Sequence, residues 1–242
     1  MNKIIFGRKT IRFSVIRSAR RKKTIALSIE PDGKVLVRAP VNTSCSRLTH
    51  VVKSKAEWII TKLGSLNDVS QQLKKEFVSG ESFYYLGRHM RLKILKDRDV
   101  KKTVVRMCRG RLEVIMNPAG KNGKVHEEIR DVITEWYKMQ AARRIPERVE
   151  IYAGKMGLKV PGVFIRDQKK IWGSCSTKGV LRFNWRIIMA PMSLVDYVVV
   201  HELCHLKYRN HSKSFWRYVG MIMPDYEKRR EKLRKKGELY QF

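Results

Sequence analysis

Acidic residues are scarce in this sequence. Its 242 residues include 22 Asp and Glu against 53 Lys and Arg, which leaves a formal net charge of +31. Hydrophobic residues make up 43% of the chain and aromatic residues 9%, enough to build a packed core. We therefore expect the positive charge to coat a folded protein, and we do not attribute it to disorder.

Long apolar runs are also lacking. No run approaches the roughly 20 residues that cross a bilayer, which excludes a membrane span. The first residues carry Lys3, Arg8 and Lys9 among their apolar positions, so they do not resemble a secretory signal, and we expect a cytoplasmic protein. The four cysteines form no CxxC pair, which argues against a disulfide framework and a cysteine zinc site.

Turn-forming residues divide the first half of the chain into short segments. Residues 24–30 and 35–38 flank a Pro-Asp-Gly-Lys sequence and predict a β-hairpin. Apolar residues at helical spacing predict one helix over about 43–63, ended by Gly64. Further strand-like segments lie at 77–78, 83–86, 90–95, 103–108 and 112–116. We predict a β-rich N-terminal domain with one helix over residues 1–120.

A cluster of Gly, Asn and Pro at 117–123 marks the expected domain boundary. Beyond it the pattern predicts a long helix over about 125–153, bent near Pro146. Strands are expected at 163–166, 171–175 and 180–188, with helices to the end of the chain. The fold class is therefore α+β, with a second domain over 121–242.

An HExxH sequence at 201–205 carries the most informative chemistry. Ser193 and Asp196 have the spacing of a capping box, which predicts that a helix begins at Ser193. On this helix His201 and His205 lie one turn apart on the same face, where they can bind one metal ion. Glu202 lies beside the first histidine, in the position of a general base for a metal-bound water.

A catalytic zinc ion normally takes three protein ligands, and His211 is the obvious third. The intervening residues 208–210 would end the helix, and Ser212 would cap the next one. A second group must orient each ligand histidine, for which Asp196 and Asp225 are both candidates.

Residues 201–216 resemble the signature of the YgjP-type metallopeptidase family, relatives of the SprT-like zincins. Residues 172–176 with 181–191 are similar to an upstream hairpin of that family, and 223–226 to a downstream helix junction. The resemblance implies a zincin-like metallopeptidase domain that binds Zn²⁺ and cleaves a peptide or protein. It also implies that His201, His205 and His211 are the zinc ligands and that Glu202 is the catalytic base.

Two other functions compete with a zinc peptidase. One is a metal-dependent nucleotide hydrolase, since a UTP pyrophosphatase activity is assigned to some relatives. No GxxxxGK[ST] loop is present, but Arg182, Arg186 and Arg209 are candidate phosphate ligands. The other is a basic nucleic-acid-binding protein with a structural metal site. Glu202 argues against it, because a structural site needs four ligands and no base.

Two surfaces are candidates for binding partners. A strand at 171–175 or 180–186 would hold an extended peptide along its edge, unless Trp172 and Trp185 are simply core residues. Residues 1–40 hold 11 Lys and Arg against 2 Asp and Glu, a surface suited to nucleic acid or merely to solubility. No feature of the sequence predicts an oligomeric state.

Overall fold

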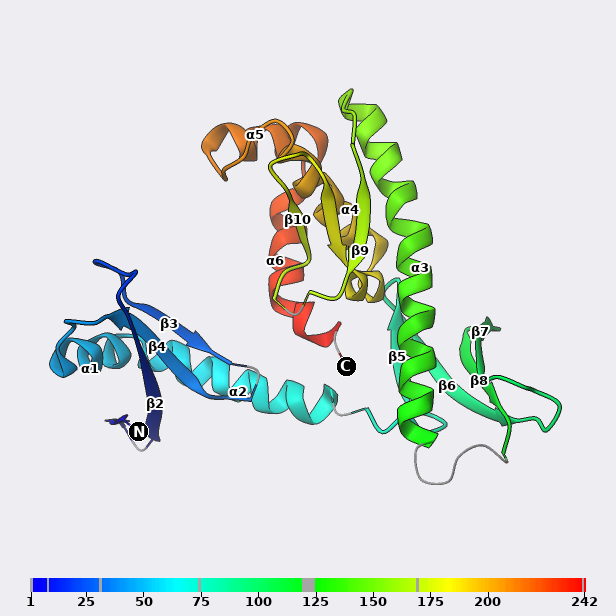
Figure 1. Ribbon diagram of the computed structural model, residues 1–242, viewed down its shortest axis with the longest axis horizontal. Helices are drawn as coiled ribbons and strands as arrows, with labels where there is room; N and C mark the ends of the chain where they lie inside the picture. The colour runs from blue at the N-terminus through cyan, green and yellow to red at the C-terminus, as the bar shows by residue number, and fades with distance from the viewer. Residues whose placement is uncertain are drawn as a thin grey trace. The chain divides into compact units, whose positions relative to one another are not determined.

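A computed structural model describes residues 2–7, 9–30, 32–73, 75–118, 125–168, 170–240 and 242, with the backbone alone over 65–73. The chain forms two compact units, Met1–Lys74 and Lys75–Phe242. Within the described residues the fold is mixed α+β, with six α-helices and three sheets (Figure 1). Among these residues, no helix combines the length and hydrophobicity needed to cross a lipid bilayer.

The first unit is a four-stranded sheet with two helices. The sheet has the order β1-β2-β4-β3 and contains β1 (Asn2–Phe6), β2 (Lys9–Ser18), β3 (Ala26–Ile29) and β4 (Val35–Pro40). The antiparallel β3–β4 pair confirms the predicted hairpin. Strand β2 runs parallel to β4, and Phe13 and Val37 pack in the core with Leu48 and Ile59 of the helices.

The helix expected over 43–63 is two helices, α1 (Cys45–Ser54) and α2 (Ala56–Leu73). The break falls at Lys55, whose backbone leaves the helical region with φ −111° and ψ 13°. The predicted end at Gly64 is wrong, because α2 continues through it to Leu73. A glycine is tolerated inside a helix at a cost of roughly 1 kcal/mol.

The second unit begins with another four-stranded sheet. It contains β5 (Ser82–Tyr85), β6 (Arg88–Lys96), β7 (Val104–Cys108) and β8 (Arg111–Met116), in the order β5-β6-β8-β7. Its first two strands are antiparallel, β6 runs parallel to β8, and β7 pairs with β8. This is the topology of the first sheet, so the same four-stranded arrangement occurs twice in the chain.

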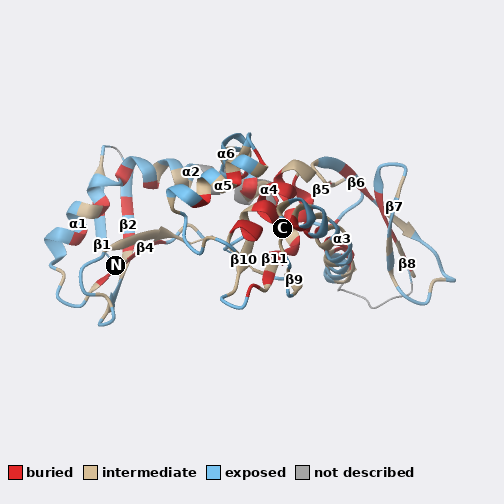
Figure 2. Ribbon diagram, turned by 90° about the horizontal axis from the view of Figure 1, so that it is seen from above, coloured by how far each residue is buried: buried red, intermediate tan, exposed pale blue. Residues whose placement is uncertain are grey.

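The rest of the second unit surrounds one buried helix. After α3 (Val125–Met156) come β9 (Val163–Arg166), β10 (Gly173–Cys175), β11 (Leu181–Asn184), the 3₁₀ helix η1 (Trp185–Met189), α4 (Met192–Cys204), α5 (Lys213–Ile222), α6 (Tyr226–Lys236) and η2 (Gly237–Leu239). Helix α4 contacts α3, β10, α5 and α6. Figure 2 shows buried residues gathered around α4. The strand expected over 180–188 ends at Asn184, whose side chain accepts from the Arg186 amide and caps η1.

The expected domain boundary at 120/121 falls outside the described residues, and the compact units meet at 74/75 instead. The second sheet belongs with the helices that follow it. The Tyr137 hydroxyl of α3 donates to the carbonyl of Tyr84, and the amide of Leu86 donates to the carbonyl of Ile188. Tyr85 also packs on Trp136, with ring centroids 5.1 Å apart. These contacts join the sheet to the core around α4, which the local sequence pattern did not predict.

Candidate metal centre

Helix α4 supplies the first part of the site. Apolar side chains lie on every face of it, as expected of a helix buried in the centre of a domain. The helix begins after Pro191, without a side-chain cap, so the predicted capping box of Ser193 and Asp196 is wrong. The Asp196 carboxylate instead accepts two hydrogen bonds from Arg148 of α3, at 2.6 and 2.9 Å, and one from Tyr152. This ion pair ties the beginning of α4 to α3.

Two histidines lie at the end of α4. His201 is in its last turn and His205 is the C-cap residue, so their rings project from the same side with centroids 5.0 Å apart. Nδ1 of His205 lies 3.0 Å from the carbonyl oxygen of Tyr208. A carbonyl oxygen only accepts hydrogen bonds, so Nδ1 carries the proton and Nε2 keeps a free electron pair. Tyr208 thus orients His205 through its backbone.

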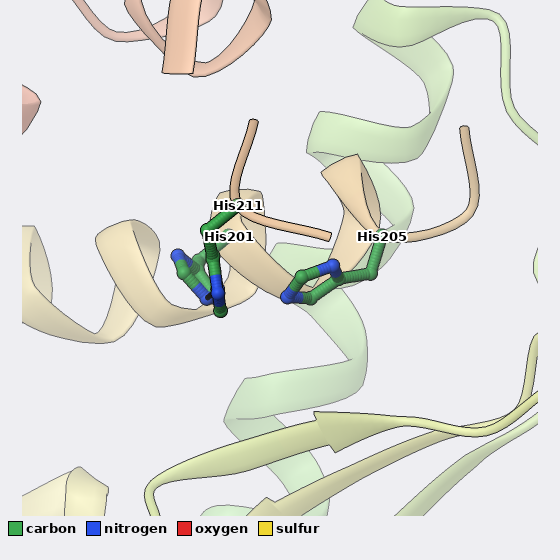
Figure 3. Close-up of side chains that lie close together, drawn as sticks. All are labelled: His201, His205 and His211. Carbon is green, nitrogen blue, oxygen red and sulfur yellow. Dashed lines mark hydrogen bonds between the residues drawn. The ribbon is translucent and has the colours of Figure 1, made fainter. Parts of the chain in front are cut away.

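The third histidine, His211, comes from the turn that follows α4. Ser212 caps α5 by accepting from the Phe215 amide, as the sequence predicted. Arg209 holds this turn in place, because its guanidinium donates to the carbonyl oxygens of Ser176 and Thr177 at 2.7 and 3.0 Å. The turn therefore brings His211 back over α4 (Figure 3).

The three rings converge on one point. Nε2 of His201 and Nε2 of His211 are 3.0 Å apart, and one nitrogen from each histidine lies within 4.8 Å of the others. Two nitrogens that bind one tetrahedral zinc ion at roughly 2.0–2.1 Å are about 3.3 Å apart, so this donor set fits a metal ion. Phe215, fully buried, contacts all three rings at centroid distances of 4.7–5.0 Å. It forms an apolar base that restricts the rings.

Burial keeps the two helical histidines neutral. It lowers the pKa of His201 to about 3, with smaller contributions from the charges of His205 and His211. Burial also lowers the pKa of His205. Neutral imidazole is the form that binds a metal ion, so both residues are ready to act as ligands at physiological pH. Nδ1 of His201 is buried and has no hydrogen-bond partner among the described residues.

Glu202 follows His201 in α4, lines the same hollow as His201, and is 5% exposed. Burial raises the pKa of its carboxyl group to about 8. Gly173 of β10 packs directly against it: a Cβ at this position would lie 2.7 Å from Cγ and 2.8 Å from Oε1 of Glu202. Strand β10 is at the edge of its sheet and pairs only with β11 among the described strands. The carboxylate and the free strand edge are therefore neighbours.

The other residues considered from the sequence have different positions. Asp196 and Asp225 pair with arginines and make no hydrogen bond to a histidine. Arg186 pairs with Asp167, and Arg209 is bound to two carbonyls, so both of these candidate phosphate ligands have internal partners. Trp185 is a core residue, 1% exposed.

A hollow of about 330 Å³ opens next to His201 and Glu202. Tyr197 and Arg230 also line it and were not predicted from the sequence as site residues. Tyr197 lies one helical turn before His201, a spacing that could have indicated it, whereas Arg230 comes from α6. Burial raises the pKa of Tyr197 to about 12, against the opposing charge of Arg230. Its hydroxyl therefore stays protonated.

Comparison with known proteins gives a family match. The family model described as "YgjP-like, metallopeptidase domain" matches residues 23–236. No curated protein matches the chain. The crystal structure of the metallopeptidase zymogen of Pyrococcus abyssi abylysin is 26% identical, with a TM-score of 0.36 over 40% of this chain and 96% of that one. The crystal structure of the metallopeptidase zymogen of Methanocaldococcus jannaschii jannalysin is 22% identical, with a TM-score of 0.36 over 39% of this chain and 97% of that one.

Proposed function

This chain belongs to the YgjP-like metallopeptidase family, and we propose that it cleaves peptide bonds with Glu202 as general base beside a zinc ion held by His201, His205 and His211. The observation that carries the proposal is the convergence of three histidine nitrogens within 4.8 Å of one another, next to a buried carboxylate. Three ligands leave one position of a tetrahedral ion open for water. When bound, the zinc ion polarises the substrate carbonyl and lowers the pKa of that water.

Glu202 moves the proton in this scheme. Its carboxylate accepts a proton from the attacking water and passes it to the nitrogen of the leaving amine. The apolar surroundings that raise its pKa to about 8 favour the protonated form after the first transfer. A nearby cation opposes this shift, so the group is ionised at neutral pH when the metal site is filled. The same side chain then acts first as base and next as acid.

The substrate backbone has a suitable binding edge. Strand β10 presents unpaired backbone groups on the side away from β11, and an extended peptide can pair with them as an added strand. Because Gly173 has no side chain, the carboxylate of Glu202 can lie directly beside this strand. A bound peptide would thus run past the base, with its scissile bond near the three histidines.

Zinc content and hydrolysis together test the proposal. We expect about one zinc per chain in the wild type and in Glu202→Gln, and a loss of zinc in His211→Ala. His50→Ala removes an exposed histidine of the first unit and is the matched control. The rate of cleavage of an unfolded protein should fall by about a thousandfold or more in Glu202→Gln, because this variant loses both the general base and the group that positions the water. Unchanged turnover in this variant would contradict the mechanism.

The nucleotide hydrolase and the nucleic-acid partner are tested in the same preparation. UTP replaces the protein substrate in one arm, and DNA is added in another at low and high salt. If the protein is a peptidase, any hydrolysis of UTP should be the same in the wild type and in Glu202→Gln. Contact with DNA through the basic surface would show as binding that weakens steeply with salt.

A further inference from the structure

The hollow beside the metal centre has one apolar side and one cationic side. It lies between α4, the residues leading into β10 and the helix α6. Its apolar lining comprises Ile171, Trp172, Tyr197, Val198 and Leu233. Its cationic lining comprises Lys170, Arg230 and Arg234. Among the described residues that line it, Glu202 is the only acidic one, so the hollow is suited to a ligand that carries negative charge.

The two arginines differ in how they are bound. Arg234 donates two hydrogen bonds to Glu231, at 2.8 and 2.7 Å, so its charge is already paired. Arg230 has no carboxylate partner within the described part of the chain. Its guanidinium lies over the ring of Trp216, 4.6 Å from the centroid. Of the two arginines, Arg230 is thus the one whose charge no carboxylate of the described residues pairs.

An aromatic stack holds this guanidinium in place. Trp216 stacks on Tyr226 with centroids 5.4 Å apart, and on the ligand candidate His211 at 5.6 Å. A guanidinium on an aromatic face keeps its edge donors available in a fixed plane, the geometry that binds a carboxylate through two parallel hydrogen bonds. Arg230 is therefore oriented before any ligand arrives.

We propose that this hollow binds a carboxylate of the peptide substrate, and that Arg230 is the specificity-determining residue that recognises it. The inference rests on the proposed peptidase function. A peptide paired with β10 passes Gly173 and Trp172, where the hollow begins. The apolar lining takes the methylene groups of the substrate, and Arg230 takes its charge. The carboxylate comes from an acidic side chain or from the C-terminus of the peptide.

A binding experiment separates these two sources without requiring turnover. The protein is the zinc-loaded full chain with Glu202→Gln, and tryptophan fluorescence reports binding, since Trp172 and Trp216 are at the site. The probes are alanine-based octapeptides with one Glu moved along the sequence, and their Gln counterparts, each with a free or an amidated C-terminus. Because general attraction to a basic protein acts at every position, only a preference at one position or at the C-terminus indicates this site.

We expect one Glu position, or the free C-terminus, to bind about tenfold or more tightly than its neutral counterpart. Arg230→Met should abolish the preference and Arg230→Lys should keep part of it, since lysine retains the charge without the planar pair of donors. Lys232→Met removes an exposed charge from the same helix outside the hollow, and should leave the preference unchanged.

Equal binding of charged and neutral peptides, or no binding of either, would overturn the proposal. A preference that survives in Arg230→Met would also overturn it. A third contradicting result would be tight binding of UTP that is lost in Arg230→Met, together with no preference among the peptides. That result would indicate a phosphate site. Failure of the peptidase function appears separately, as absence of zinc or of cleavage in the wild type. Kinetics of Arg230→Met in a chain that keeps Glu202 distinguish two roles: stabilisation of the transition state would lower kcat for all peptides equally, whereas recognition lowers kcat/KM for the preferred ones.

Discussion

Gly173 and Glu202 are packed so closely that a single methyl group on the glycine would overlap the carboxylate. A Cβ there would lie 2.7 Å from Cγ and 2.8 Å from Oε1 of Glu202. Gly173 of β10 and Glu202 of α4 are 29 positions apart in the sequence, and a residue without a side chain is what lets the two elements meet at this point. The position of the proposed base is therefore set from outside its own helix.

Gly173→Ala should lower kcat/KM for peptide cleavage by about tenfold to a hundredfold, because a displacement of Glu202 of the order of 1 Å spoils proton transfer. Zinc content should not change, since the three atoms nearest to a Cβ at Gly173 all belong to Glu202 and none to a histidine. Gly154→Ala in α3 is the control, because a Cβ there has nothing within 4 Å. Equal activity of the two variants would show that Glu202 does not need its present position.

Glu202 should make the metal-free protein less stable as pH rises. Burial raises the pKa of its carboxyl group from 4.5 to about 8, so the folded state holds a proton that the unfolded state has lost between these values. Stability therefore falls from about pH 4.5 to 8 and stays low above that range. Urea unfolding with a chelator should show Glu202→Gln more stable than the wild type at pH 9, by a few kcal/mol. The two proteins should converge near pH 4; a constant difference would contradict the linkage.

Asp196→Asn should destabilise the second unit by about 2–4 kcal/mol, because it leaves the Arg148 guanidinium partly buried without its carboxylate. The pair is 25% and 10% exposed at Arg148 and Asp196. Asp225→Asn breaks the more exposed pair with Arg229 and should cost less than about 1 kcal/mol. Denaturant midpoints measure both. Similar losses of stability in the two variants would mean that burial of the Arg148–Asp196 pair does not increase its contribution to the free energy of unfolding.

Arg209→Met should weaken zinc binding by about tenfold, because outer residues that position a ligand commonly affect metal affinity to this extent. Arg209 anchors the turn that carries His211 to the carbonyls of Ser176 and Thr177. Competition with a chromophoric chelator measures the affinity. Arg217→Met removes an exposed arginine from α5 and should have no effect, so a matching loss in that variant would assign the change to net charge alone.

Local patterns in the sequence predicted most of the elements and the three histidines that the structure brings together. The repeat of 3.6 residues per turn places His201 and His205 on one side of a helix, and turn-forming residues mark the hairpin of β3 and β4. These predictions depend on neighbours within a few residues. One error arose where a distant group decided the outcome, since Asp196 pairs with Arg148 rather than capping α4. Another was local, since Asn184 caps a 3₁₀ helix at residues where a strand was expected.

The sequence by itself determined the donor groups, the spacing of two histidines on one helix and the excess of positive charge. Only the tertiary structure decided how His211 reaches the same point, which glycine makes room for Glu202 and which arginine faces the hollow. Helical spacing follows from backbone geometry, which is the same for any chain. The other relationships join residues 10 to 60 positions apart, and packing of the core around α4 brings those segments together.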